Sequence, residues 1–118
     1  MFQTVRHRKM NNQIKEIWIE SEHKGAIVGG ELETNDNSDV IVTFSDDSRA
    51  IATFFTYRNI EFLRQKNKET GEYLNGKFFW ASDMFIVDKI NRQEVEKIIN
   101  HLISEDCFFE IFKKIIED

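Results

Sequence analysis

The stretch that decides the fold is residues 78–87, which read FFWASDMFIV. Apolar side chains fall on both faces of this stretch when it is extended, with one polar interruption at Ser82-Asp83. Strands that are apolar on both faces lie in the middle of a sheet, so we expect residues 78–88 to form a central strand. A polar pair in such a strand costs free energy unless it is hydrogen-bonded. Ser82 and Asp83 are therefore either a buried structural hinge or the edge of a site.

Aromatic residues gather around this stretch, since nine of the fifteen lie between Phe54 and Phe85. Two predicted strands precede it, Val40–Phe44 and Arg49–Thr56, joined as a hairpin by a four-residue loop. The second of these strands is also apolar on both faces, which places it centrally in the same sheet. Residues 13–20 and 26–34 predict two further strands, and Gly29-Gly30 within the latter predicts a bulge.

The pattern changes to a helical period over residues 56–70, which predicts a helix with a basic outer side that ends at Gly71. Asn75-Gly76 then predicts a hairpin turn before the central strand. In the C-terminal third, Asn91 is a natural helix N-cap, and an apolar stripe at helical spacing follows it. Residues 108–116 predict a second helix that is apolar around most of its circumference. Such a helix must bury two sides, either in its own core or against a partner, including a second copy in a homodimer.

These elements together predict an α+β fold. We expect an antiparallel meander of four or five strands, with one connecting helix and two C-terminal helices packed on the sheet. The chain has 118 residues and shows no repeat or linker, so we expect a single domain over residues 1–118, with residues 1–12 as a mobile N-terminal arm.

The same composition predicts a cytoplasmic protein that has no contact with a membrane. The one cysteine, Cys107, cannot form an internal disulfide, which fits a reducing compartment. No stretch approaches the roughly 20 apolar residues of a membrane span. The basic residues near the N-terminus are not followed by the apolar run of a secretory signal, so none is expected.

No motif in the sequence predicts catalysis, a cofactor or a metal site. The three histidines lie far apart in different predicted elements and lack the spacing of metal ligands. Cys107 is adjacent to Phe108 on a helix expected to be packed, where a cysteine is a small inert apolar residue. Ser82 and Asp83 have no histidine companion, and neighbours on a strand point to opposite faces. We therefore expect a protein that is not an enzyme and that has no catalytic residues, no cofactor and no metal.

Charge indicates the kind of partner. A net charge of −5 argues against nucleic acid, whose phosphates require clustered basic residues. Residues 31–48 contain six acidic residues and no lysine or arginine. This segment is either a solvated face or a docking surface for a basic protein, because acidic clusters steer such partners. The expected contact residues are four acidic positions with two aromatic anchors: Asp36, Asp39, Asp46, Asp47, Tyr57 and Tyr73.

Three segments carry a resemblance to a known group of proteins: residues 53–60 (TFFTYRNI), 67–72 (NKETGE) and 79–84 (FWASDM). They resemble small bacterial proteins, some of which are similar to immunity proteins of contact-dependent or polymorphic toxin systems. The resemblance spans about residues 30–112. It implies a cytosolic inhibitor that binds one secreted toxin domain and blocks its active site, and many such toxins are basic nucleases.

Two functions from different classes follow from these observations. The first is a non-enzymatic immunity protein that neutralises a cognate toxin domain, such as a nuclease, through its acidic surface. The alternative is a small-ligand-binding or regulatory module whose pocket lies beside Ser82 and Asp83.

Overall fold

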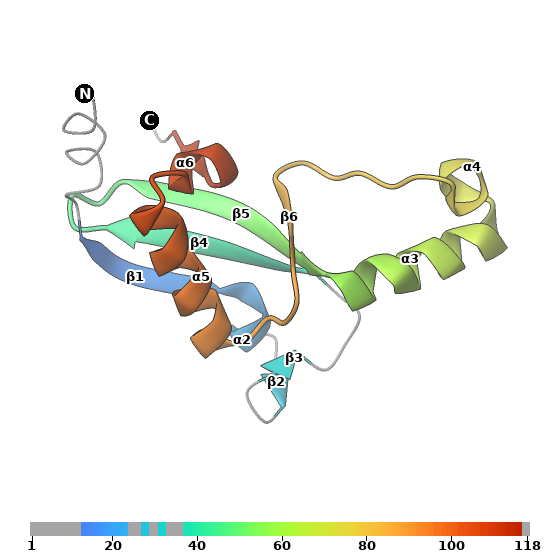
Figure 1. Ribbon diagram of the computed structural model, residues 1–118, viewed down its shortest axis with the longest axis horizontal. Coiled ribbons are helices and arrows are strands. Elements are labelled where there is room, and N and C mark those ends of the chain that lie inside the picture. Colours follow the sequence, from blue (N-terminus) through green and yellow to red (C-terminus); the bar gives the residue numbers. More distant parts are fainter. Residues whose placement is uncertain (1–12, 24–26, 29–30, 33–36, 117–118) are drawn as a thin grey trace.

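The computed structural model describes residues 13–23, 27–28, 31–32 and 37–116. Its main sheet has the strand order β1-β4-β5-β6, and a fifth strand, β7, also pairs with β5 (Figure 1). The predicted α+β fold class is confirmed. The bounds of the five strands are Ile14–Ile19 for β1, Ser38–Phe44 for β4, Arg49–Thr56 for β5, Met84–Val87 for β6 and Lys113–Ile115 for β7.

Five helices and a small second sheet complete the described elements. The helices are α2 (Glu20–His23), α3 (Tyr57–Thr70), α4 (Glu72–Gly76), α5 (Arg92–Ser104) and α6 (Phe108–Ile111). The small sheet pairs β2 (Ile27–Val28) with β3 (Glu31–Leu32) in antiparallel orientation. The single strand predicted over residues 26–34 is therefore wrong, because its two described parts pair with each other. The predicted bulge at Gly29-Gly30 and the predicted N-terminal arm at residues 1–12 lie outside the described residues.

The β4–β5 hairpin forms where the sequence predicts it. In its loop, the Phe44 backbone N–H donates to the Ser48 carbonyl over 2.9 Å, and Asp47 takes a positive φ of 68°. Side chains alternate along both strands, and those on one face are buried: Val40, Val42, Phe44, Ala50, Ala52 and Phe54. The small alanines let the covering layer approach the sheet closely.

The far edge of β5 is shared by two short strands. β7 pairs antiparallel with residues 49–51, and β6 pairs parallel with residues 53–56. The central strand predicted over residues 78–88 is therefore wrong in its length, because only Met84–Val87 is a strand. The physical reason is that the register of β6 would place residues 80–82 opposite residues 49–51 of β5, and β7 already pairs with those residues. Trp80, expected in the core, is 64% exposed.

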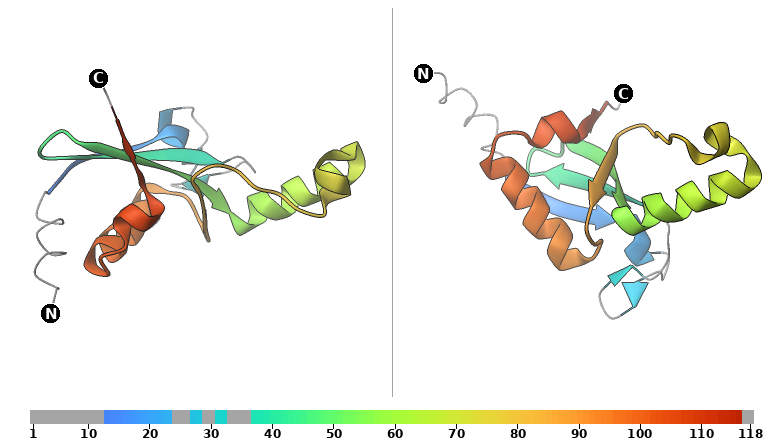
Figure 2. Two further views of the ribbon diagram at one scale, coloured as in Figure 1. Left: turned by 90° about the horizontal axis from the view of Figure 1, so that it is seen from above. Right: turned by 45° about the vertical axis from the view of Figure 1, so that its right-hand side comes forward.

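The C-terminal third supplies the second layer of the core. The Asn91 side chain accepts a 2.8 Å hydrogen bond from the backbone N–H of Glu94 and caps α5 as predicted. Val95, Ile99 and Leu102 are buried on the stripe that faces the sheet. Figure 2 shows α5 lying along one face of the sheet.

The second C-terminal helix is shorter than predicted. It ends at Ile111, and residues 113–115 form β7 instead of continuing the helix to residue 116. The edge of β5 that β6 leaves uncovered provides the backbone partners that make a strand favourable there. Phe108 and Phe112 are buried, with their rings stacked 4.4 Å apart, so these two side chains lie in the core of their own chain. A homodimer through this helix stays a prediction.

An ion pair ties α2 to the start of α5. The Arg92 guanidinium donates to both carboxylate oxygens of Glu22, at 2.7 and 3.0 Å. These hydrogen bonds hold the pKa of the Glu22 carboxyl below its ordinary value. Both side chains remain partly exposed, so the pair contributes at most about 1 kcal/mol.

Among the described residues, no helix is both long enough and apolar enough to cross a membrane.

We predict that Glu22→Gln lowers the free energy of unfolding at neutral pH by less than about 1 kcal/mol. The folded-state pKa of Glu22 lies below its unfolded value, so the stabilisation is complete above the unfolded pKa. It is lost as the pH falls through the folded-state pKa. Chemical denaturation across the acid range should therefore show the variant and the wild type converging at low pH.

The control for this measurement is Arg92→Gln, alone and combined with Glu22→Gln. The double variant should lose little more than Arg92→Gln alone, because Arg92→Gln already removes the pair with Glu22 as well as the 3.5 Å pair with Glu96. An equal loss at neutral and at acidic pH would contradict the ionic origin of the effect.

Candidate functional site

The most distinctive feature of the molecule is a projection that we call the α3–α4 arm, residues 57–83. It consists of α3, α4 and the returning segment 77–83. Figures 1 and 2 show that α3 extends away from the sheet and that α4 lies at the far end of α3, from where the chain returns to β6. Of the residues of α3, only Asn59 and Asn67 are buried.

Local signals in the sequence define the two ends of α3. The Thr56 side chain accepts a 2.9 Å hydrogen bond from the Asn59 backbone N–H and caps the N-terminus. Gly71 ends the helix in the left-handed region, at a φ of 86°, and its N–H donates to the Asn67 carbonyl. Both features agree with the predicted helix and its glycine stop.

The tip of the arm is not the predicted hairpin turn. Tyr73, Leu74 and Asn75 all have positive φ angles, from 52° to 60°, and form a left-handed turn. An Asn-Gly hairpin requires a strand on each side, and here a helix precedes the turn and an irregular segment follows it. Gly76 then packs against the middle of α3, where an added Cβ would lie 2.7 Å from the Arg64 carbonyl oxygen.

Aromatic contacts join the arm to the body of the protein. The rings of Phe55 and Phe79 are 5.8 Å apart, and Phe79 in turn lies 5.2 Å from Tyr73. The Tyr73 ring also meets Phe78 edge-on at 5.4 Å. Phe55 is a buried residue of β5, so this series of rings runs from the sheet to the tip. Edge-to-face pairs of this kind contribute about 0.5–1.5 kcal/mol each beyond the area that they bury.

Exposed apolar side chains are concentrated on the arm. Of the eight large hydrophobic residues that are exposed in the described part of the chain, six lie within residues 57–83. These six are Tyr57, Phe62, Tyr73, Leu74, Phe78 and Trp80. The other two, Phe109 and Ile116, lie near the C-terminal end. Contiguous exposed apolar surface on a soluble domain commonly marks a binding site.

Charged residues accompany these aromatics on α3. The helix carries four basic and two acidic residues, in a chain whose net charge is −5. Hydrogen bonds from Arg64 and Gln65 lower the pKa of the Glu61 carboxyl, and the same contact raises the pKa of Arg64. The arm therefore combines apolar anchors with a partly basic polar surface.

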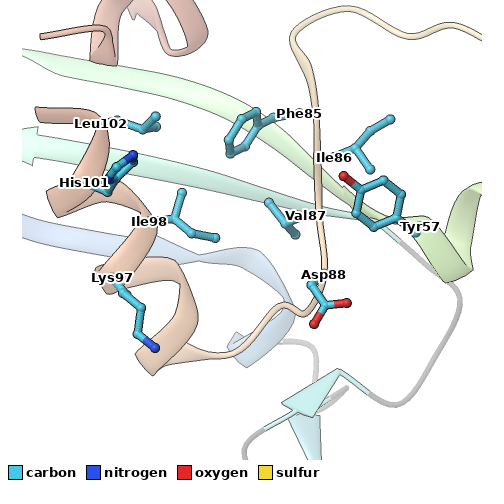
Figure 3. Close-up of a pocket in the computed structure, with 9 residues that line it drawn as sticks. All are labelled: Tyr57, Phe85, Ile86, Val87, Asp88, Lys97, Ile98, His101 and Leu102. Carbon is cyan, nitrogen blue, oxygen red and sulfur yellow. The ribbon is translucent and has the colours of Figure 1, made fainter. Parts of the chain in front are cut away.

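A separate apolar groove of about 520 Å³ lies between α5 and β6 (Figure 3). One side of the groove is lined by Ile98, His101 and Leu102 of α5. The opposite side is lined by residues 85–88, which are the last three residues of β6 and the Asp88 that follows them. Figure 3 shows Phe85 and Val87 pointing toward α5 and Ile86 pointing the other way, toward Tyr57. Polar groups, including Lys97 and Asp88, lie at the rim.

A smaller cavity of about 240 Å³ lies at the base of the arm. Ile60, Phe79 and Ile86 are among the residues that line it, together with two basic residues, Arg64 and Lys77. The side chains of Asn59 and Asn67 are buried in the arm, and their Oδ1 and Nδ2 atoms, respectively, have no hydrogen-bond partner in the described part of the chain.

Of the acidic residues predicted as partner contacts, three are described, and they lie in two places. Asp46 and Asp47 form the tip of the β4–β5 hairpin, where Asp46 accepts hydrogen bonds from Ser48 and Asp47 pairs with Lys15 at 2.7 Å. Asp39 lies at the other end of β4, where its carboxylate accepts from the Thr53 hydroxyl. Asp36 lies outside the described residues. The two places are separated by most of the length of β5, about 20 Å.

The two predicted aromatic anchors both lie on the arm. Tyr57 is the first residue of α3 and Tyr73 is in α4, and both are exposed. Ser82 and Asp83 form the turn before β6, where the Asp83 carbonyl accepts from the Thr53 N–H and its carboxylate lies 3.7 Å from Lys113. Neither residue lines the groove or the cavity described above. A pocket beside them stays a prediction.

Comparisons with protein-family models, with curated proteins and with solved structures find no match to this chain.

Sequence reasoning missed four of the six exposed apolar residues of the arm: Phe62, Leu74, Phe78 and Trp80. Phe78 and Trp80 lie in the segment 78–88, for which the sequence predicts a central strand. The available signal was the polarity of residues 56–70, since a helix that is polar around most of its circumference cannot cover a core. Such a helix beside an aromatic-rich segment indicates that some of the aromatic residues stay exposed.

We predict that Trp80 is readily quenched by iodide and Trp18 much less so. Trp80 is 64% exposed, whereas Trp18 is only partly accessible. Fluorescence of Trp18→Phe and Trp80→Phe isolates each residue in turn. A similar quenching constant for both tryptophans would contradict the exposed position of Trp80.

We also predict that Gly76→Ala destabilises the arm by about 1–3 kcal/mol, because the new Cβ would meet backbone and the φ of 77° is strained for alanine. Hydrogen exchange of the α3 amides measures this change. The matched control is Gly71→Ala, whose φ is also positive but whose added Cβ would lie 3.6 Å from its nearest neighbour, the Asn75 side-chain oxygen, so its effect should be smaller. Equal effects would show that the close approach to Arg64 is unimportant.

Proposed function

We propose that this protein is a non-enzymatic immunity protein that binds a cognate toxin domain through the α3–α4 arm. The observation that carries the proposal is the concentration of exposed large apolar side chains on one projecting element. Exposed apolar patches on soluble domains commonly mark protein-interaction sites. The resemblance of residues 53–60, 67–72 and 79–84 to toxin-immunity proteins supplies the class of partner.

The shape of the arm suits the blocking of a cleft. Enzyme active sites are concave and mostly apolar, with a few polar groups that fix orientation. A narrow convex element with aromatic side chains and flanking charges is complementary to such a cleft. Tyr57 and Trp80 are exposed anchors of the type that dominates binding energy at protein interfaces. The inhibitor then acts by occupying the cleft, and it needs no catalytic group of its own.

The acidic residues have a different role in this proposal. Asp46 and Asp47 at the hairpin tip, with Asp39 and Asp36, add to the field of a chain whose net charge is −5. Such a field raises the association rate with a basic partner, and the effect weakens as salt is added. Steering by acidic residues and anchoring by aromatic residues therefore come from different parts of the surface.

A small-ligand or regulatory module is the second candidate. The α5–β6 groove supports this candidate, because its volume of about 520 Å³ lies within the range of about 300–1,000 Å³ that is typical of ligand sites. Phe85, two residues after Asp83, is the first residue of this segment that lines the groove. The arm is the stronger support, because a ligand in this groove would leave most of the exposed aromatic residues unexplained.

The test uses a candidate toxin domain, inactivated at its catalytic residue, and measures affinity by calorimetry. Phe62→Ser combined with Trp80→Ser should weaken binding by about 30-fold or more, equivalent to the 2 kcal/mol of an interface hot spot. Phe109→Ser is the matched control, because Phe109 is an exposed phenylalanine outside the arm. Unchanged affinity in a correctly folded arm variant would show that the arm is not the contact surface. Failure of the toxin domain to bind at all would reject the immunity function.

The acidic contribution is tested in the same system with Asp46→Lys combined with Asp47→Lys. We expect slower association and a weaker dependence on salt, with dissociation nearly unchanged, because rim charges act mainly on the encounter step. If affinity and its salt dependence were both unchanged, electrostatic steering by this hairpin would be wrong.

A further inference from the structure

The edge strands of the main sheet differ sharply in how they are protected from pairing with other chains. β1 carries Lys15 and Glu16 and contains a register shift between Ile14 and Glu16. β7 is a three-residue strand with two lysines. Charges, bulges and short length are the usual means by which proteins prevent edge-to-edge association.

β6 is also short, at four residues, but it carries no charge and no register shift. Its sequence is Met84-Phe85-Ile86-Val87, and no other strand of the described residues pairs with its outer edge. An uncharged, apolar edge strand is a template for another strand. The four consecutive residues 85–88 line the groove, and β5 lies behind β6 in Figure 3, so the groove runs along this free edge.

The direction of the backbone groups identifies which residues would pair. The Asp83 carbonyl accepts from the Thr53 N–H and therefore faces β5. Backbone groups alternate along a strand, so those of Phe85 and Val87 also face β5, and those of Met84 and Ile86 face outward. An added antiparallel strand forms its hydrogen-bonded pairs with the outward residues.

We propose that β6 pairs antiparallel with β6 of a second copy, about a two-fold axis at Ile86. The sheet then continues across the dimer, with Ile86 opposite Ile86 of the second copy and Met84 opposite its Asp88. In this arrangement the same faces of the two sheets lie on the same side, as an isologous contact requires.

The sequence around β6 is complementary to itself in this register. Asp83 precedes the strand and Lys89 follows it, so each lies opposite the other in the second copy. In the dimer each of these residues would face an opposite charge of the second copy in addition to its contacts within its own chain, where Asp83 lies 3.7 Å from Lys113. Neighbouring registers do not align these two residues. Charge complementarity of this kind selects a register more than it adds affinity.

The groove provides space for the apolar side chains of the added strand. Phe85 and Val87 of the second copy would enter on the α5 side, against Ile98 and Leu102. The contact is one short strand with its flanking groove, at the low end of interface sizes, below about 1,200 Å². We therefore expect association in the micromolar range, independent of any toxin.

The test is sedimentation velocity of the full chain alone, over a range of micromolar concentrations. We expect a reversible shift from the 14.0 kDa monomer to a species of twice that mass. Ile86→Pro should abolish the shift while retaining the β5 ladder, because proline is tolerated where an edge N–H points outward. Ile116→Ser is the control, since Ile116 is the most exposed apolar residue among those described and lies outside β6.

A charge exchange keeps the proposal testable if Ile86→Pro does not fold. Lys89→Asp should weaken the dimer, because it places two acidic residues opposite each other, and Asp83→Lys added to it should restore dimerisation. A chain that stays monomeric throughout the range would overturn the proposal. A dimer that is insensitive to Ile86→Pro and to the charge exchange would place the contact on another surface and would equally overturn it.

Discussion

The parallel pairing of β6 with β5 is the constraint on which the rest of the structure depends. Parallel neighbours require a crossover of about a dozen residues or more, and here the whole segment 57–83 serves as that connection. A crossover helix usually packs on the face of its sheet. α3 instead extends away from the sheet, so the chain must fold back along it to reach β5 again (Figure 1). The arm, the free edge of β6 and the groove beside α5 all follow from this one pairing.

The same pairing determines the C-terminal end of the described structure. β6 covers only the last four residues of β5, so residues 49–51 keep unpaired backbone groups on that edge. β7 supplies their partners, and it leaves the preceding helix only one turn long. Phe112 lies at this transition, where its ring stacks on Phe108 and contacts Phe54 of β5 at 6.0 Å. The aromatic packing therefore holds both the short helix and the last strand against the sheet.

Features set by local interactions could be predicted from the sequence. The β4–β5 hairpin, the glycine that ends α3 and the Asn91 cap of α5 each depend on residues within a few positions of one another. Residues 78–83 could not be predicted in this way, because aromatic residues there are compatible with a core strand or with an exposed connection. The deciding fact is that β7, which comes later in the chain, pairs with residues 49–51 of β5 and so occupies the edge that residues 80–82 would need. The candidate site was found only in part for the same reason: Tyr57 and Tyr73 could be named as anchors, but the exposure of Trp80 depends on where α3 points.

The acidic hairpin lies apart from the two proposed contact surfaces, which meet at Tyr57, an arm residue that also lines the α5–β6 groove. Asp46 and Asp47 lie at the end of β5 that is remote from the arm, and the outer edge of β6 lies between α5 and Tyr57. A dimer through β6 would carry two arms, one from each copy. The two basic helices would carry like charges, which disfavours binding of one arm by another arm.

The left-handed turn at Tyr73, Leu74 and Asn75 has a consequence for the order in which the protein unfolds. Each non-glycine residue in this region costs about 1–2 kcal/mol relative to a right-handed conformation, somewhat less for asparagine. The buried, unpaired amide atoms of Asn59 and Asn67 add a further cost in the same element. We therefore expect the arm to be the cooperative unit of lowest stability among the described elements, able to open and close while the phenylalanine core stays intact. Binding of a partner to the arm would therefore slow the local opening of the arm and leave the stability of the sheet unchanged.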